Sequence, residues 1–104
     1  MVFDNNGNII AEQRLLIYTF ALHKYQYLKE HNCNEGICAC LKGGITLVSQ
    51  TDEDLNIFDC LPEFQKIKKE FGKGPDTYWW KRDFDRIPFF KTMIKETEQI
   101  ILNK

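Results

Sequence analysis

The chain has 104 residues, of which 43% are hydrophobic and 28% are charged, and its formal net charge is −1. These values are typical of one globular domain, which we expect to span residues 1–104. They disfavour a membrane protein, because no apolar run approaches the ~20 residues that cross a bilayer. They also disfavour a general binder of duplex nucleic acid, which normally carries more positive charge.

The N-terminal residues Met1 to Asn8 lack a basic stretch and a small-residue cleavage site, so we expect no secretory signal. Together with four cysteines in no disulfide-type pattern, this predicts a protein of the reducing cytoplasm.

Charge is divided unevenly along the chain. Residues 1–61 hold 4 basic and 8 acidic side chains, whereas residues 62–95 hold 9 basic and 5 acidic ones. Two interpretations stay open: the basic half faces an anionic partner, or the charges are solvated or attract one another within the fold.

A turn over residues 4–8 precedes a long helix that we predict over residues 9–30. Its main apolar face consists of Ala11, Leu15, Tyr18, Leu22 and Tyr25, widened by Ile17, Ala21 and Leu28. A second apolar stripe on the far side consists of Leu16, Phe20 and Tyr27. The strip expected to be solvated consists of Glu12, Thr19, His23, Gln26 and Glu30. A helix with two apolar sides is either central to the fold or also used in an oligomer contact, so we expect a homo-oligomer.

After a loop at residues 31–36, the segment from Ile37 opens a second helix. The pair Gly43-Gly44 makes the continuation ambiguous, because glycine weakens both helices and strands. Residues 45–48 therefore continue the helix, which we favour, or form a short β element.

The second half of the chain contains two further helices. Residues 51–54 resemble a capping box, and Leu55, Phe58 and Leu61 follow at a spacing of three. A short amphipathic helix begins near Pro62, residues 72–76 break the chain, and a last helix runs over residues 85–102 with Pro88 in its first turn. The apolar stripe of this last helix consists of Ile87, Phe90, Ile94, Thr97 and Ile101, widened by Met93 and Ile100. We therefore predict a mostly α fold, a small single-domain bundle of about four helices.

Cysteine and histidine side chains are the candidate metal ligands. The candidates are His31, Cys33, Cys38 and Cys40, with Cys60 apart. Zinc favours such ligands, but on a helix Cys38 and Cys40 point about 200° apart, so partly buried thiols are the better interpretation. A catalytic Cys–His pair would use His23 or His31, and neither has an activating context. We expect no metal site and no cofactor.

Paired carboxylates at residues 52–54 and at Asp83 and Asp85 stand where helices begin, and acids at helix N-termini are explained by capping. No G-x-S-x-G elbow, phosphate-binding loop or dinucleotide fingerprint occurs in the chain. We therefore predict no catalytic residues and a protein that is not an enzyme.

The segment over residues 78–86 is the candidate ligand-binding site. Its members are Tyr78, Trp79, Trp80, Lys81, Arg82 and Arg86, which include both tryptophans of the chain. Flat aromatic faces beside cations are suited to stacking on bases and holding phosphates. The alternative is that the tryptophans cover an edge of the core and that Arg86 forms a buried ion pair, with Glu63 as a candidate partner.

Several short motifs resemble a group of small proteins encoded by bacteriophages and prophages. The motifs are Gly36-Ile37-Cys38, Leu61-Pro62-Glu63-Phe64, Tyr78-Trp79-Trp80 and Asp85-Arg86-Ile87, within residues 10–100. That group often has prolines where Glu70 and Lys81 stand here, and it carries no settled activity. The resemblance implies an accessory protein of the host cytosol that binds a host protein or a host immune nucleotide signal.

Three functions follow as expectations, and the lowest-ranked of them is an enzyme or metal-binding protein built on His31 and the cysteines. The first is a non-enzymatic protein that sequesters an anionic small ligand, such as a nucleotide signal, at residues 78–86. The second is an interaction module that inhibits a host protein through the apolar surface of the first helix.

Overall fold

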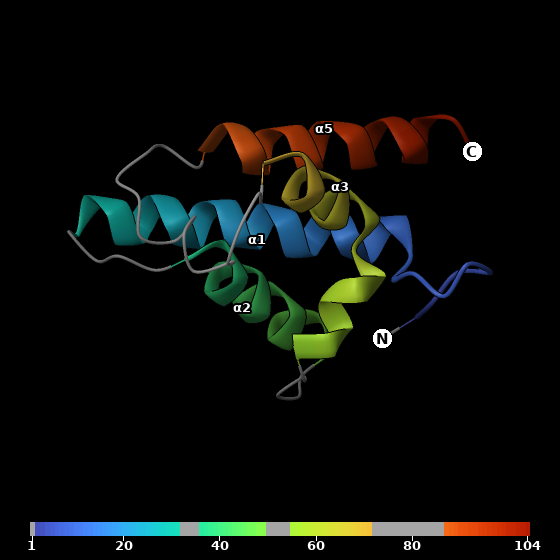
Figure 1. Ribbon diagram of the computed structural model, residues 1–104, viewed down its shortest axis with the longest axis horizontal. Helices are drawn as coiled ribbons and strands as arrows, with labels where there is room; N and C mark the ends of the chain where they lie inside the picture. Colours follow the sequence, from blue (N-terminus) through green and yellow to red (C-terminus); the bar gives the residue numbers. More distant parts are fainter. Residues whose placement is uncertain (1, 32–35, 50–54, 72–86) are drawn as a thin grey trace.

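The computed structural model describes residues 2–31, 36–49, 55–71 and 87–104 of the chain (Figure 1). Within these ranges the elements are α1 (Ala11–Glu30), α2 (Ile37–Ser49), the 3-10 helix η1 (Leu55–Cys60), α3 (Pro62–Phe71) and α5 (Ile87–Leu102). This composition confirms the predicted mostly α bundle.

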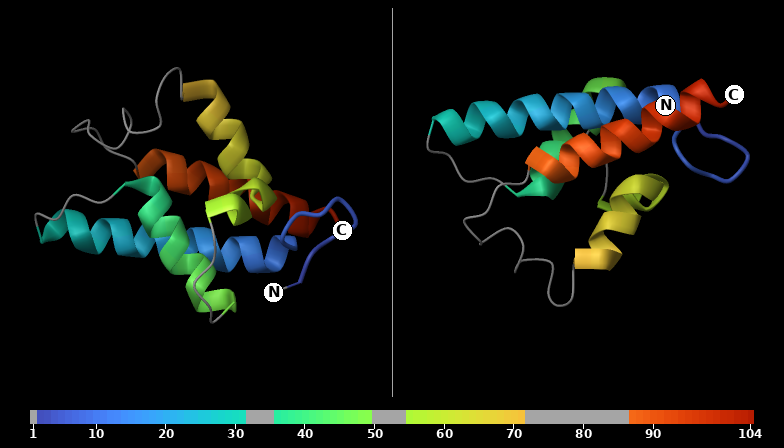
Figure 2. Two further views of the ribbon diagram at one scale, coloured as in Figure 1. Left: turned by 60° about the horizontal axis from the view of Figure 1, so that its bottom comes forward. Right: turned by 90° about the horizontal axis from the view of Figure 1, so that it is seen from above.

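Helices α1 and α5 form the long axis of the bundle. They lie side by side and run in opposite directions, so that the start of α5 is next to the end of α1 (Figures 1 and 2). Two contacts mark this register: the Tyr25 and Phe90 rings are 5.7 Å apart at one end, and Lys104 pairs with Glu12 at the other. Helix α2 crosses α1 obliquely, and α3 packs against α5 (Figure 2).

One core joins all of these helices. Its largest fully buried apolar side chains are Tyr18, Phe64, Phe90, Ile9, Ile17, Ile37, Leu41, Ile45, Leu61 and Met93. Helix α1 contributes its predicted apolar face to this core, with Tyr18, Ala21 and Leu22 buried. The periodicity of that face was therefore a correct guide to the central helix.

The N-terminal turn is held by a side chain, as the composition of residues 4–8 suggests. The Asp4 carboxylate accepts hydrogen bonds from the amides of Asn6 (2.8 Å) and Asn8 (3.0 Å), and Gly7 adopts φ +79°. Phe3 and Ile9 form an isolated antiparallel bridge, and the Ile9 amide donates to the Cys60 carbonyl. Ile9 is thus outside the helix that we predicted to include it, because its amide bonds to the end of η1.

The segment over residues 45–48 is helical, so the alternative of a short β element there is wrong. The glycines at 43 and 44 do not end α2 but allow it to approach α1. A Cβ atom on Gly44 would lie 2.6 Å from the carbonyl oxygen of Ile17, closer than real contacts. The stability that glycine costs within a helix is offset by this close packing of two backbones.

We expect Gly44→Ala to lower the free energy of unfolding by about 1–2 kcal/mol, because overpacking costs more than the gain in helix propensity. Gly43→Ala is the matched control. Its Cβ would meet the Phe20 ring at 2.9 Å and the Lys24 ammonium at 3.3 Å, and both side chains can move. Urea denaturation of the two variants checks the difference, and equal stabilities would contradict the close approach at Gly44.

The chain between α2 and α3 ends in η1, whose period of three suits the spacing of Leu55, Phe58 and Leu61. Proline begins α3 at Pro62 and is the second residue of α5 at Pro88, positions where a helix has no partner for the amide.

Within the described ranges, no helix combines the length and apolar character that crossing a bilayer requires.

Candidate functional site

The predicted ligand-binding residues Tyr78, Trp79, Trp80, Lys81, Arg82 and Arg86 lie outside the described residues. The described structure does locate the two points to which their segment is joined. The chain leaves α3 at Phe71 and enters α5 at Ile87. In the sequence, Arg86 is adjacent to Ile87, the first residue of α5.

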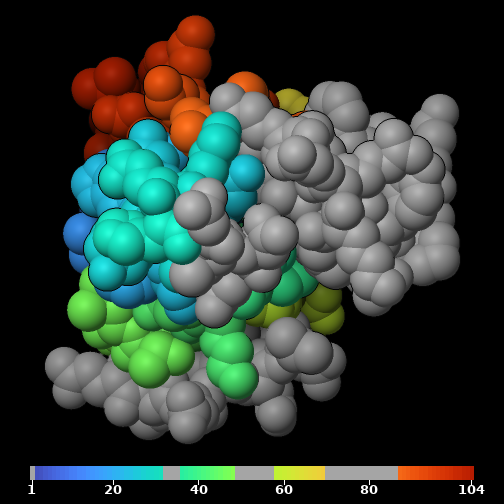
Figure 3. Space-filling view, turned by 90° about the vertical axis from the view of Figure 1, so that its left-hand side faces the viewer, coloured from blue at the N-terminus to red at the C-terminus, as the bar shows by residue number. Residues whose placement is uncertain are grey.

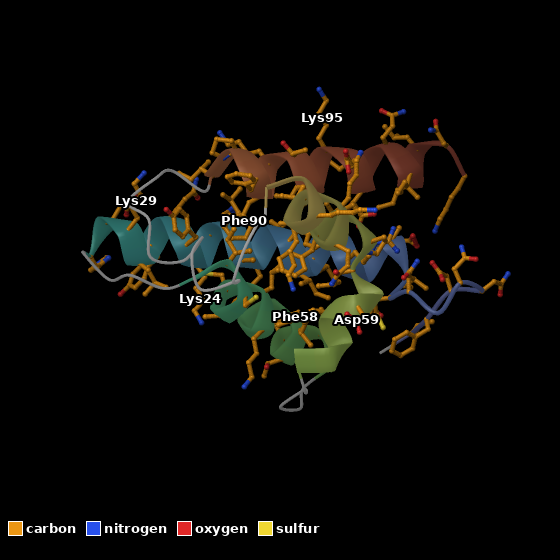
Figure 4. All side chains as sticks on the ribbon, viewed as in Figure 1. Lys24, Lys29, Phe58, Asp59, Phe90 and Lys95 are labelled. Carbon is orange, nitrogen blue, oxygen red and sulfur yellow. The ribbon has the colours of Figure 1, made fainter. Side chains whose placement is uncertain are left out.

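Helix α1 supplies basic side chains at the end of the bundle where α5 begins. The register is set by the contact of Tyr25 with Phe90, and Lys24 and Lys29 are one residue before and four residues after Tyr25. Figure 4 shows both lysines on the C-terminal half of α1, and Figure 3 shows that half beside the start of α5. Lys91 of α5 is exposed here, and so is the acidic Glu30. Lys24 lies against Gly43 of α2, whereas Lys29 is on the other side of α1.

The N-terminus of α5 adds a partial positive charge. The first amides of a helix have no intrahelical acceptor, and the helix dipole places about half a positive charge there. Helices α1 and α3 have an acid in the first turn, Glu12 and Glu63, whereas α5 has none. In the sequence, however, Asp85 stands two residues before Ile87, where an acid is suited to capping this helix.

A buried ion pair lies elsewhere, where α1 meets α3. The Arg14 guanidinium donates from Nε to Glu63 Oε1 (2.8 Å) and from Nη2 to Glu63 Oε2 (3.2 Å). It also donates from Nη1 to the carbonyl of Ile9, and Asp4 is 3.8 Å away. Only 3% of Arg14 and 4% of Glu63 are exposed. Glu63 is therefore paired with Arg14, whereas Arg86, which we named as a candidate partner of Glu63, lies outside the described residues.

Tyr18 completes this cluster by donating its hydroxyl hydrogen to Glu63 Oε1 at 2.9 Å. Burial, reinforced by the negative charge of Glu63, raises the pKa of Tyr18 far above its ordinary value, so the phenol stays protonated. A carboxylate held by a guanidinium and a phenol has little capacity left for a substrate. We interpret Arg14, Tyr18 and Glu63 as a structural cluster that holds α3 and the N-terminal turn against α1.

The cysteine candidates are distributed over the core and its edge. Cys40 is buried, whereas Cys38 and Cys60 are half-buried, and these three carry thiols that are not joined in disulfides. Burial, with the nearby carboxylates of Asp59 and Asp4, raises the pKa of the Cys60 thiol, which disfavours a reactive thiolate. Cys33 lies outside the described residues. Among the described side chains, no three of His, Cys, Asp or Glu gather as metal ligands.

The second apolar stripe of α1 reaches solvent. Leu16 is 58% exposed and Tyr27 is 60% exposed, while Phe20 is half-buried against α2. The His31 ring stacks on the Tyr27 ring with the centroids 4.1 Å apart. Of the strip expected to be solvated, Glu12, His23 and Glu30 are exposed, but Thr19 and Gln26 are half-buried.

Sequence reasoning missed Arg14. It is positioned three residues after Ala11 and four before Tyr18, so it falls on the predicted apolar face, and that placement was the available signal. A charged side chain on a buried face requires a buried partner. Glu63, between the apolar residues Leu61 and Phe64, shows the same anomaly.

No protein-family model matches the chain, and neither a curated protein nor a solved structure matches it significantly.

Proposed function

We propose that this chain is a non-enzymatic accessory protein that binds an anionic small ligand, such as a nucleotide signal, at residues 78–86. Tyr78, Trp79 and Trp80 stack on the base, and Lys81, Arg82 and Arg86 hold the phosphates. The observation that carries the proposal is the position of these cations in the chain. Arg86 directly precedes α5 in the sequence, and Lys29 is an exposed cation of α1 at the end of the bundle where α5 begins.

Two physical reasons support an anion here. A helix N-terminus attracts phosphates, because its amides point outward and its dipole is positive. Arginine binds phosphate oxygens with two parallel hydrogen bonds and also stacks on flat rings, which suits a ligand with a base and a phosphate.

We expect the Arg82→Ala, Arg86→Ala double variant to weaken nucleotide binding at least ~10-fold, since a hydrogen bond to a charged group contributes about 1.5–3 kcal/mol. A panel of cyclic and linear nucleotides is screened by thermal shift, which reports binding to the native state. Because both tryptophans lie in the segment, their fluorescence should change with the bound ligand. Binding should also weaken as salt is added, to the extent that the site is open to solvent.

Lys95→Ala is the matched control, because Lys95 is an exposed cation of α5 that points away from the bundle (Figure 4). It should bind as the unmodified chain does. A folded double variant with unchanged affinity would contradict the proposal, and so would the absence of any nucleotide binding across the panel.

A further inference from the structure

The exposed side of α1 has a spacing that reads the same in both directions. Six residues follow this side: Glu12, Leu16, Phe20, His23, Tyr27 and His31. They are separated by 4, 4, 3, 4 and 4 positions, so the row is symmetric about the middle of α1. Five of the six are exposed, and Phe20 is half-buried. We call this set the α1 row.

We propose that the α1 row is a two-fold interface to a second copy of this chain, with the two α1 helices antiparallel. About such an axis, Leu16 of each chain faces Tyr27 of the other, Phe20 faces His23, and Glu12 faces His31. A two-fold interface uses the same patch on both subunits, so the patch must be complementary to itself reversed. The spacing of the row meets that requirement.

The chemistry of the facing positions is also complementary. The two apolar positions of greatest exposure, Leu16 and Tyr27, meet each other rather than a charge. The Glu12 carboxylate, which pairs with Lys104 of its own chain, meets the imidazole of His31. Antiparallel helices also place the positive end of one dipole beside the negative end of the other.

Helix α2 extends the same surface. Leu47 is 56% exposed and lies three residues after Gly44, so it is on the face of α2 that packs toward α1. That face meets α1 at Ile17 and at Phe20, which is a member of the row. The interface therefore includes an apolar contribution from α2 as well as α1.

The size of the row sets the expected affinity. Twenty residues of helix span about 30 Å at a width of about 10 Å, so the row alone covers roughly 300 Å² per chain, against about 800 Å² in a standard interface. We expect a reversible dimer whose dissociation constant is in the micromolar range or weaker, which sedimentation velocity over a concentration series measures.

The antiparallel arrangement is tested by complementation. Leu16→Glu alone and Tyr27→Lys alone should each raise the dissociation constant at least ~10-fold, because each places two unpaired charges in an apolar contact. An equimolar mixture of the two variants should associate again. In the mixed dimer one contact pairs the new carboxylate with the new ammonium, and the other is the native Leu16–Tyr27 contact.

Leu102→Glu is the matched control, because Leu102 is an exposed apolar side chain of α5 outside the row. It should dimerise as the unmodified chain does, and circular dichroism checks that every variant is folded. The proposal is overturned if the unmodified chain stays monomeric over the concentration series. In that case the row would be a surface for contact with a different protein. It is also overturned if the mixture of folded variants does not associate, or if Leu102→Glu weakens the dimer as much as Leu16→Glu. Nucleotide binding at residues 78–86 has a separate readout, so either proposal can fail alone.

Discussion

Replacing Arg14 with alanine is expected to lower the free energy of unfolding by about 3–5 kcal/mol, because it leaves the Glu63 carboxylate buried without its cation. Most of that loss comes from the stranded charge, since Glu63 is 4% exposed and water cannot replace the guanidinium. The Ile9 carbonyl also loses its donor. Urea denaturation followed by circular dichroism measures the change.

Two further variants separate the charge from the packing. If Arg14→Ala does not fold, Arg14→Met combined with Glu63→Leu removes both charges, and it should recover most of the stability because neither charge is then stranded. Tyr18→Phe removes only one hydrogen bond to the carboxylate and should cost about 1.5 kcal/mol. The three variants together compare the loss of the cation alone, of both charges, and of the phenol hydroxyl.

Lys66 and Glu96 form the matched control, because their ion pair (2.9 Å) joins α3 to α5 at the surface. Lys66→Ala should cost no more than about 1 kcal/mol, since exposed pairs are screened by water. A loss below that value for Arg14→Ala as well would show that water reaches Glu63 in solution.

Phe90→Ala is expected to lower the free energy of unfolding by about 3–5 kcal/mol, the usual cost of truncating a buried aromatic side chain. Phe90 is fully buried and points from α5 toward α1, where it meets Tyr25 (Figure 4). Its removal leaves a cavity between the two longest helices, and those helices can close it only by shifting together.

The neighbouring Phe89 provides the matched control, because it has the same side chain but is half-buried at the edge of the core. Phe89→Ala should cost clearly less than Phe90→Ala, since less apolar surface was removed from water. Thermal unfolding of both variants compares them in one experiment. Equal losses would mean that α5 is rotated about its axis relative to the structure.

The periodic helices could be predicted because their pattern is local. The apolar positions of α1 and the stripe of α5 that includes Phe90 and Met93 repeat with the helical period, so they identify the buried faces without knowledge of a partner. The turn at Asp4 could also be predicted, because the Asp4 side chain accepts hydrogen bonds from amides within the same few residues.

The candidate site was predicted from composition, since two tryptophans and three cations within nine residues are evident in the chain itself. The sequence did not show which end of the bundle that segment is joined to, and the structure was needed to identify it. Lys24 and Lys29 are distant from Arg86 in sequence, and only the antiparallel register of α1 and α5 brings their end of α1 to the start of α5.

By itself the sequence determined the helical class of this protein, the faces of α1 and α5 and the N-terminal turn, because those features depend on neighbours within a few residues. Only the tertiary structure decided the state of residues 45–48, the partner of Glu63 and the exposure of Leu16 and Tyr27. In α2 the close approach of the Ile17 backbone at Gly44 outweighs the low helix propensity of glycine. Glu63 pairs with Arg14 because the tertiary fold brings together two side chains that are 49 positions apart, and no local pattern in the sequence predicts such a contact.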